Sequence, residues 1–371
     1  MNYSPRISLY VHFPWCLKKC PYCDFLSFPI SQKVNFKRYT NSLLKDWSND
    51  KSWLQGRTLQ TIYFGGGTPS LADPEIFASL FSEIKKSNSA NLQNIEITLE
   101  VNPGTLDPSK MQVWREMGIN RISVGVQSFQ DEKLKVLGRI HSSQEAIDAI
   151  KILQKNGFQN INCDLMYGLP GQTLANALLD LKKAISLGVQ HISWYQLTIE
   201  QNTAFHKTPP SNLPCEDLIA KIEEQGRELL AKYGFIQYEI SAYSQKGYQS
   251  QHNLNYWLFG DYLALGPGAH GKVTDLAKKT VVRYVKTSDF KTSSQKITQD
   301  QLPLEFMLNA LRLVNQPISK KLFSSRTNLP FSSISKTLAK AEKIGFCQIE
   351  KYLFYPTKLG QKFLQDFLLM F

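Results

Sequence analysis

Six short runs rich in β-branched and aromatic residues recur through the first 200 residues, with helical segments between them. The runs occupy residues 7–13, 61–64, 95–101, 121–126, 161–168 and 191–199. Strands that alternate with helices at this spacing are typical of a parallel sheet. Several runs are apolar almost throughout, as expected of strands that are covered on both faces. Six such units predict an open, partial β/α barrel, and a doubly wound α/β sheet is the alternative.

The 371-residue chain is too long for one ordinary core, and its charge is unevenly placed. Residues 1–270 carry 26 basic and 24 acidic side chains, whereas residues 271–371 carry 17 and 7. The basic part has helical periodicity followed by a short hairpin, which predicts a small winged-helix-like α+β domain. We therefore expect a barrel over residues 1–235, a connecting segment over 236–271 and a basic C-terminal domain over 272–371.

The excess of lysine and arginine in the C-terminal domain fits an anionic partner, which could be nucleic acid, anionic lipid or another protein. A solvated basic face is the alternative. Nucleic-acid binding is the weakest of these interpretations, since winged-helix-like domains often mediate only protein contacts. No stretch approaches the roughly 18 apolar residues that a membrane span needs. The first residues also lack the zones of a signal peptide, so a cytoplasmic location is expected.

Three cysteines, Cys16, Cys20 and Cys23, lie within eight positions in the spacing C-x3-C-x2-C. In a reducing compartment, clustered cysteines hold metal or do redox chemistry more often than they form disulfides. Three thiolates cannot complete a structural zinc site, which normally has four protein ligands. A cubane 4Fe-4S cluster fits better, because three cysteines leave one of its four irons open to another ligand.

Polar residues and glycine turns follow the predicted strands at their carboxyl ends, where β/α barrels carry their active sites. The second strand leads into GGGTP at 65–69, the third ends at Glu100, the fourth at Gln127, and the fifth contains Asp164. A glycine turn can present backbone N–H groups to a carboxylate or phosphate. Each residue taken alone also fits an ordinary cap or loop position. Their occurrence at successive strand ends favours one shared site.

The cysteine spacing, with Tyr10 upstream and GGGTP after the next strand, resembles the radical S-adenosylmethionine (radical SAM) superfamily. YVHFPWCLKKCPYCDF, EVNPGT, GVQSF, DLMYGLPGQT and YLALGPGAHG resemble, more narrowly, the oxygen-independent coproporphyrinogen III oxidase family. The resemblance implies a partial barrel with a 4Fe-4S cluster on the three cysteines. It also implies that SAM chelates the fourth iron through its amino and carboxylate groups. The implied SAM contacts are Tyr10, Tyr22, Gly66, Gly67, Thr68, Glu100, Gln127, Arg139 and Asp164.

Two departures separate this chain from the members of that family that oxidise coproporphyrinogen. Those members carry a further cysteine at the position of Phe25, and an N-terminal extension before the cysteine loop. Both departures are features of the related haem chaperone group, often called HemW. HNLNYW at 252–257 matches that group's H-N-x-x-Y-W signature. The resemblance thus implies haem contacts at His252, Asn253, Tyr256 and Trp257. Without it, His252 would be interpreted as a hydrogen-bonded loop histidine.

Two functions from different classes therefore stay open, and the sequence assigns no catalytic residue. The first is a cytoplasmic haem chaperone that passes haem to apo-haemoproteins, some of them at the inner membrane face, where the basic domain would dock. The second is a radical SAM enzyme that decarboxylates the propionates of coproporphyrinogen III. A homodimer is compatible with either function.

Overall fold

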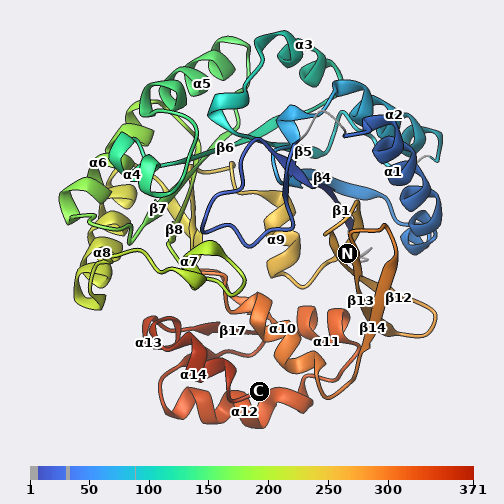
Figure 1. Ribbon diagram of the computed structural model, residues 1–371. Coiled ribbons are helices and arrows are strands. Elements are labelled where there is room, and N and C mark those ends of the chain that lie inside the picture. Colours follow the sequence, from blue (N-terminus) through green and yellow to red (C-terminus); the bar gives the residue numbers. More distant parts are fainter. Residues whose placement is uncertain (1–6, 31–33, 88) are drawn as a thin grey trace.

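The computed structural model describes residues 7–30, 34–87 and 89–371, which form a curved sheet of twelve strands with helices outside it (Figure 1). The six predicted strands are confirmed as β1 (Ile7–Phe13), β4 (Leu59–Gly66), β5 (Glu96–Val101), β6 (Arg121–Gln127), β7 (Ile161–Tyr167) and β8 (His191–Gln196). These six pair in parallel and in chain order, without a reversal. The partial barrel is thus confirmed, and the doubly wound alternative is wrong because such a sheet reverses its strand order.

The sheet also contains strands from the region after residue 235. Strand β11 (Asp261–Leu265) pairs in parallel with β1, so the first strand lies between two neighbours of very different sequence position. The antiparallel strands β10 (Ala242–Ser244) and β9 (Ile236–Glu239) extend the sheet beyond β8. On the other side β12 (His270–Asp275), β13 (Thr280–Lys286) and β14 (Thr292–Ile297) extend it beyond β11. The predicted connecting segment 236–271 therefore contributes strands to the sheet, which continues to Ile297.

Helices follow most of the parallel strands and cover the outer face of the sheet (Figure 1). They are α1 (Phe36–Asp50), α2 (Pro74–Lys86), α3 (Pro108–Glu116), α5 (Ser143–Lys155), α6 (Leu174–Ser186) and α8 (Glu216–Lys232). Short helices α4 (Asp131–Val136), α7 (Ala204–Lys207) and α9 (Gln251–Trp257), with 3-10 turns at Lys51–Leu54, Pro69–Leu71 and Pro103–Thr105, occupy the loops. Asp73 and Asp107 cap α2 and α3, and the proline that follows each fits the first helical turn, where no intrahelical donor is needed.

The strands are apolar on their outer side only, which differs from the prediction of two apolar faces. In β1, Leu9, Val11 and Phe13 pack in the main hydrophobic core. The alternate residues Tyr10 and His12 hydrogen-bond to each other inside the barrel. The same alternation recurs along the next strands, where most interior residues are polar and include the cationic Arg121 beside tyrosine, threonine, serine, histidine, carboxylate and amide side chains; Met166 is an apolar exception. A polar interior is unlike the packed apolar layers of a closed barrel, and it suits a polar ligand.

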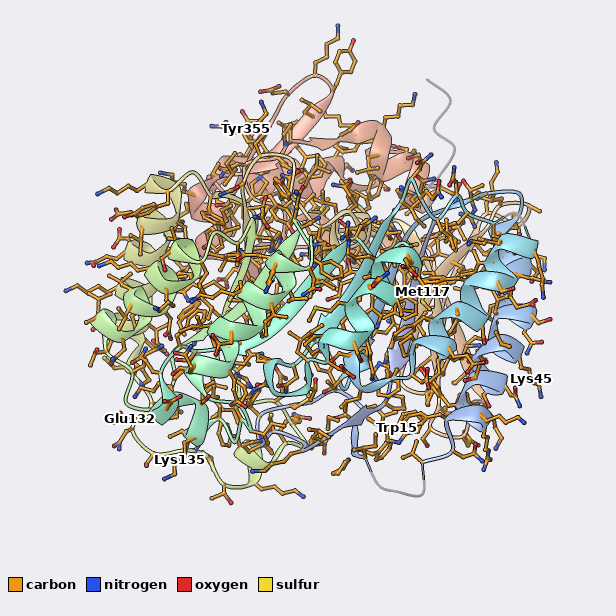
Figure 2. All side chains as sticks on the ribbon, turned by 90° about the horizontal axis from the view of Figure 1, so that it is seen from above. Trp15, Lys45, Met117, Glu132, Lys135 and Tyr355 are labelled. Atoms are coloured by element: carbon orange, nitrogen blue, oxygen red, sulfur yellow. The ribbon has the colours of Figure 1, made fainter. Side chains whose placement is uncertain are left out.

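A second hydrophobic core lies in the C-terminal part of the chain. It is formed by α10 (Leu302–Ala310), α11 (Lys320–Thr327), α12 (Ser332–Lys343), α13 (Lys358–Lys362) and α14 (Leu364–Leu368) with a small sheet of β15 (Ile318–Ser319), β17 (Leu353–Pro356) and β16 (Cys347–Ile349). Helices followed by a β wing match the predicted winged-helix-like arrangement. Figure 2 shows Tyr355 of the wing and Trp15 of the cysteine loop at opposite ends of the molecule.

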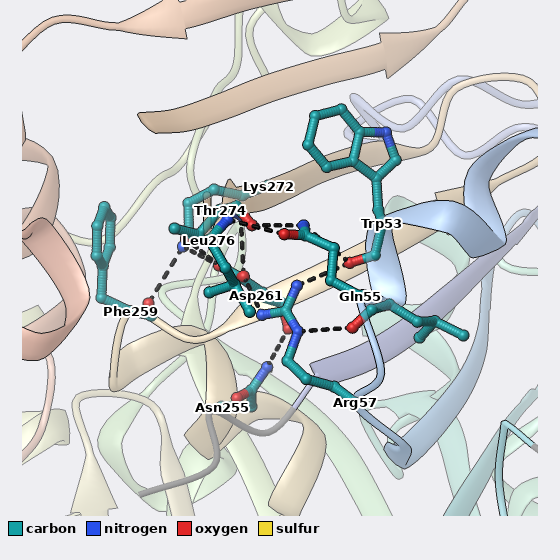
Figure 3. Close-up of polar contacts among 10 residues, drawn as sticks. Trp53, Gln55, Arg57, Asn255, Phe259, Asp261, Lys272, Thr274 and Leu276 are labelled. Carbon is teal, nitrogen blue, oxygen red and sulfur yellow. Dashed lines mark hydrogen bonds and ion pairs between the residues drawn. The ribbon is translucent and has the colours of Figure 1, made fainter. Parts of the chain in front are cut away.

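A buried ionic cluster fixes β11 and its turn to the rest of the barrel (Figure 3). The carboxylate of Asp261 pairs with Arg57 at 2.6 Å and with Lys272 at 3.3 Å, and it accepts a hydrogen bond from Thr274 N. Lys272 also donates to the carbonyl of Phe259, whose ring contacts Phe306 of the second core. The cluster therefore anchors the strand that joins the two cores. Within the described ranges, no helix is long and apolar enough to cross a membrane.

Candidate functional site

The loop that carries the three cysteines is held firmly at its base by backbone hydrogen bonds. Thr68 N donates to Trp15 O, and Ile30 N donates to Cys16 O, each at 2.7 Å. The short strands β2 (Trp15–Cys16) and β3 (Phe28–Pro29) pair in parallel across the loop. His12 makes a hydrogen bond of 2.8 Å with the carbonyl of Leu26 from below. The loop is thus fixed over the carboxyl end of β1.

Cys16, Cys20 and Cys23 all line one cavity of about 420 Å³ at that end of the barrel. Burial raises the pKa of the Cys16 and Cys23 thiols, so a metal that binds them must displace their protons. Among the described residues, no group of three side chains is gathered closely enough for a single metal ion. A cubane cluster does not need that arrangement, because each cysteine binds a different iron. Three thiols that face one cavity fit such a cluster.

The glycine turn after β4 forms a wall of the same cavity, and its shape depends on missing side chains. Gly66 has φ +109°, and a Cβ there would overlap the ring of His12. A Cβ on Gly67 would overlap the carbonyl oxygen of Trp15. Only glycine allows the backbone to approach both groups this closely. Gly66, Gly67 and the buried Thr68 line the cavity. Their backbone N–H groups donate to Glu100, to Phe13 O and to Trp15 O, so the expectation that this turn offers free N–H groups to an anionic ligand is not met.

Two half-buried carboxylates, Glu100 and Asp164, reach the cavity from β5 and β7. Glu100 accepts hydrogen bonds from Tyr63 OH at 2.8 Å and Gly66 N at 3.1 Å, and its burial raises its pKa to about 7. Asp164 accepts from Asn162 and Ser123, and burial raises its pKa as well. Neither has an ion-pair partner within the described part of the chain. Carboxylates that have a raised pKa and no ion-pair partner favour the binding of a cationic ligand.

Three further predicted residues, Tyr22, Gln127 and Arg139, line the cavity beside the cysteines. Gln127 has φ +70° and accepts a hydrogen bond from Tyr195 OH at 2.8 Å. Arg139 donates to the carbonyl of Gly125 at 2.6 Å and to Cys20 Sγ at 3.7 Å. Eight of the nine predicted SAM residues therefore surround the cavity of the three cysteines.

Tyr10 is the ninth, and it lies behind the cavity wall. Its hydroxyl bonds to His12 Nδ1 at 3.0 Å, and its ring stacks near Tyr63 with centroids 6.1 Å apart. The residues that the prediction missed, Tyr63, Ser123 and Tyr195, do line the cavity. Tyr63 and Ser123 face the interior at alternate positions of β4 and β6, which end at the predicted residues Gly66 and Gln127, whereas Tyr195 lies in β8, which contains no predicted residue. Because side chains alternate between the two faces of a strand, this two-residue period would have predicted that they face the interior.

The predicted haem residues lie on α9, at the amino ends of the parallel strands and away from the cysteine cavity. Glu96 at the start of β5 accepts hydrogen bonds from the backbone N–H groups of Gln251 and His252, both at 3.0 Å. His252 is only 2 % exposed, and its ring lies 5.0 Å from that of Tyr63. Helix α9 therefore closes the floor of the barrel, beneath the layer of tyrosines.

The ring of His252 has one nitrogen in use and one without a partner among the described residues. Thr61 Oγ1 donates to Ser8 and therefore accepts from His252 Nδ1, at 2.8 Å. Nε2 then carries a buried lone pair. Burial, with a smaller effect from Arg121, lowers the pKa of His252 to about 3, so the ring is neutral. A neutral imidazole whose other nitrogen is held by a hydrogen bond resembles a metal-binding histidine.

Of the other residues of the motif, only Tyr256 has its ring beside that of His252, with centroids 5.2 Å apart. Tyr256 stacks on Tyr262 with ring centroids 4.0 Å apart. Trp257 lies under the guanidinium of Arg312, 4.4 Å from the ring centroid, and so faces the second domain. The backbone N–H of Asn253 bonds to Ser250, which caps the helix. The structure thus does not gather the four predicted haem residues on one surface.

The raised pKa of Glu100 predicts that the binding of a cationic ligand depends on pH. Only the ionised carboxylate attracts an ammonium or sulfonium group, so we expect the affinity for SAM to fall roughly tenfold between about pH 8 and about pH 6. Equilibrium dialysis of labelled SAM with reconstituted protein measures this. Glu100→Gln should bind more weakly and lose the change centred near pH 7. An affinity that stays constant in the native chain would contradict the prediction.

Comparison with known proteins gives matches over the whole chain. The radical SAM superfamily profile matches residues 10–184, and the HemN C-terminal domain profile matches residues 297–363. Proteins named heme chaperone HemW from Haemophilus influenzae and Escherichia coli are each 43 % identical, over 99 % of this chain and 98 % of their own. The one from Bacillus subtilis is 32 % identical over 95 % of this chain and 96 % of its own.

Among solved structures, a coproporphyrinogen III oxidase from Escherichia coli, described as a radical SAM enzyme, superposes with a TM-score of 0.81. The match covers 99 % of this chain and 90 % of the oxidase, at 20 % sequence identity. At this identity the likeness shows the fold alone. The fold and the family resemblance expected from the cysteine, glycine and H-N-x-x-Y-W motifs are thereby confirmed.

Proposed function

Because the chain belongs to the HemW family of the radical SAM superfamily, we propose that it is a haem chaperone, which binds haem and passes it to apo-haemoproteins. The observation that carries this proposal is the 43 % identity to two heme chaperones over nearly the full length of both partners. A match at that level covers the cysteine loop, the barrel and the basic domain together. The alternative is oxidation of coproporphyrinogen III, for which the likeness to an oxidase shows a shared fold and no shared activity.

We propose further that a 4Fe-4S cluster binds Cys16, Cys20 and Cys23 and that SAM occupies the adjoining cavity. When bound, such a cluster can supply an electron to SAM. The backbone at Gly66–Thr68 would meet the methionine part of the ligand. Glu100 and Asp164 are half-buried in the cavity wall and have no ion pair with any described residue, which suits them to pair with its cationic groups or to accept from ribose hydroxyls. Gln127 and Arg139 complete the wall beside Cys20.

For haem, the proposed ligand is His252 through Nε2, whose lone pair has no partner in the described chain. Nδ1 is already oriented by Thr61, as in metal-binding histidines. The ring is packed between Tyr63 and Tyr256, with centroid distances of 5.0 and 5.2 Å. A porphyrin can reach Nε2 only if α9 moves off the floor of the barrel. Tyr256 and Trp257 would then offer their ring faces to it.

The exposed side chain of Phe25 bears on the choice between chaperone and oxidase. It lines the mouth of the cysteine cavity and is 59 % exposed, at the position where the oxidases carry a further cysteine. A phenyl ring supplies no metal ligand and no proton. This difference favours the chaperone. The proposed recipients are apo-haemoproteins, with the chain in the cytoplasm and peripheral at the inner membrane face; a homodimer is compatible with these roles.

One paired experiment tests the proposal under anaerobic conditions. We expect the reconstituted protein with dithionite and SAM to leave coproporphyrinogen III unchanged by chromatography, while a parallel sample binds haem tightly and stoichiometrically. His252→Ala should lower the haem affinity at least about tenfold and change the haem spectrum, because it removes an iron ligand.

Gln251→Ala is the matched control, since this neighbour is exposed on the same helix and its side chain donates to the nearby carbonyl of Gln249. It should leave haem binding unchanged. Formation of protoporphyrinogen would establish the oxidase instead. Unchanged haem spectrum and affinity in His252→Ala would remove this residue as the ligand.

A further inference from the structure

One surface of the C-terminal domain combines exposed apolar side chains with a row of lysines. Ile344, Leu359 and Phe363 are 53 %, 44 % and 42 % exposed. Ile344 directly follows α12, Leu359 lies in α13, and Phe363 directly follows α13. A Cβ on Gly345 would lie 3.4 Å from Leu359, and the rings of Phe346 and Phe363 stack with centroids 6.3 Å apart. The three side chains therefore belong to one patch.

Five lysines surround this patch or lead to it, and all are exposed. Three of them recur along α12 at helical spacing, so they share its outer face, opposite the buried Ile334 and Leu338. The other two flank Leu359 on α13, and one of them lies 5.9 Å over the ring of Phe363. Within the described chain none has an ion-pair partner. They are Lys336, Lys340, Lys343, Lys358 and Lys362.

Acidic side chains do not cancel this charge locally. Glu342 faces away, since its carboxylate accepts a hydrogen bond from Ile349 N at 2.7 Å. Asp366 is the other acid near the patch, on α14. Helices α10 and α11 separate α12 from the barrel (Figure 1), so a partner on this surface leaves the cysteine cavity free. We call the three apolar residues and the five lysines the lysine-apolar face.

We propose that the lysine-apolar face docks on a membrane surface that contains anionic lipid. The apolar side chains would enter the headgroup region, and the lysines would pair with lipid phosphates while their stems cover apolar surface. Nucleic acid would also attract the lysines, but it offers no environment for three neighbouring apolar side chains. The face also contains no arginine, which is the residue best suited to phosphate and base recognition.

The inference extends the peripheral location included in the proposed function by naming the surface responsible. A lysine near an anionic membrane contributes roughly a fivefold change in binding. Replacing Lys340, Lys343 and Lys362 with glutamine should therefore weaken vesicle binding by roughly a hundredfold. Leu359→Asp with Phe363→Asp should abolish it, because both charges would enter the headgroup region.

The test is co-sedimentation of the full chain with vesicles of phosphatidylcholine alone or with about one quarter phosphatidylglycerol. We expect binding to the anionic vesicles only, and weaker binding in high salt. The control replaces Lys278, Lys279 and Lys291 with glutamine, which removes three exposed lysines that lie elsewhere, around β13. Circular dichroism and haem titration of each variant show that folding and haem binding are retained.

Three results would overturn the inference. They are equal binding to neutral and anionic vesicles, loss of binding in the control triple variant, or no vesicle binding together with tight, salt-dependent binding of duplex DNA. Each can occur while haem titration stays normal, so failure of this inference is distinguishable from failure of the haem chaperone proposal.

Discussion

The Cys20→Ser variant is expected to emerge from anaerobic reconstitution without the proposed 4Fe-4S cluster. A serine hydroxyl does not provide the soft thiolate that iron-sulfur clusters require, and only three cysteines are available to hold this one. We therefore expect the iron and sulfide content and the cluster's visible absorption to fall close to zero. The fold should remain, because the loop is held by backbone hydrogen bonds that do not involve the Cys20 side chain.

Cys215→Ser provides the matched control for this experiment. Cys215 is a free, exposed cysteine at the start of α8 and does not line the cavity. Its replacement should leave the iron content unchanged. Equal iron in the two variants would contradict the assignment of the cluster to the loop. Loss of iron from both would instead show that reconstitution depends on cysteines outside the loop.

The strands were predictable because local composition decides most of them. Runs such as ISLYVHF in β1 and INCDLMY in β7 carry apolar residues at the outward positions, which pack under helices. Strand β11 was missed for a different reason. Its five residues lie between glycines, and its pairing with β1 joins residues about 250 positions apart, which no local pattern reveals.

The cavity was predictable from topology more than from any single residue. Since parallel strands end at the same edge, Glu100 and Asp164 had to come together once the barrel was assigned. Tyr10 lies behind the cavity wall because it contacts His12, and the sequence alone does not predict this packing contact. The floor helix α9 was also unpredictable. It is held there by Glu96, Thr61 and Tyr238, which come from three distant parts of the chain.

Asp261→Ala is expected to lower the free energy of unfolding by about 3–5 kcal/mol, because it leaves two buried cations unpaired. The Asp261 side chain is about 3 % exposed and those of Arg57 and Lys272 are 4 % and 8 % exposed. Burial by itself raises the pKa of Asp261, but the fields of Lys272 and Arg57 outweigh burial and hold that pKa below its usual range. Urea unfolding of the variant and of the native chain measures the difference.

The lowered pKa also fixes the pH at which the stabilisation disappears. The contribution of Asp261 is fully present above the unfolded pKa of about 3.9 and is lost as the pH falls through the lower folded value. The difference between native and variant should therefore shrink in acid. The Asp289–Lys291 pair, 2.6 Å apart with side chains 53 % and 81 % exposed, is the control. Asp289→Ala should leave stability unchanged, since exposed pairs contribute little. Equal losses of stability in the two variants would contradict the claim that burial gives the Asp261 cluster its large contribution to holding β11 in place.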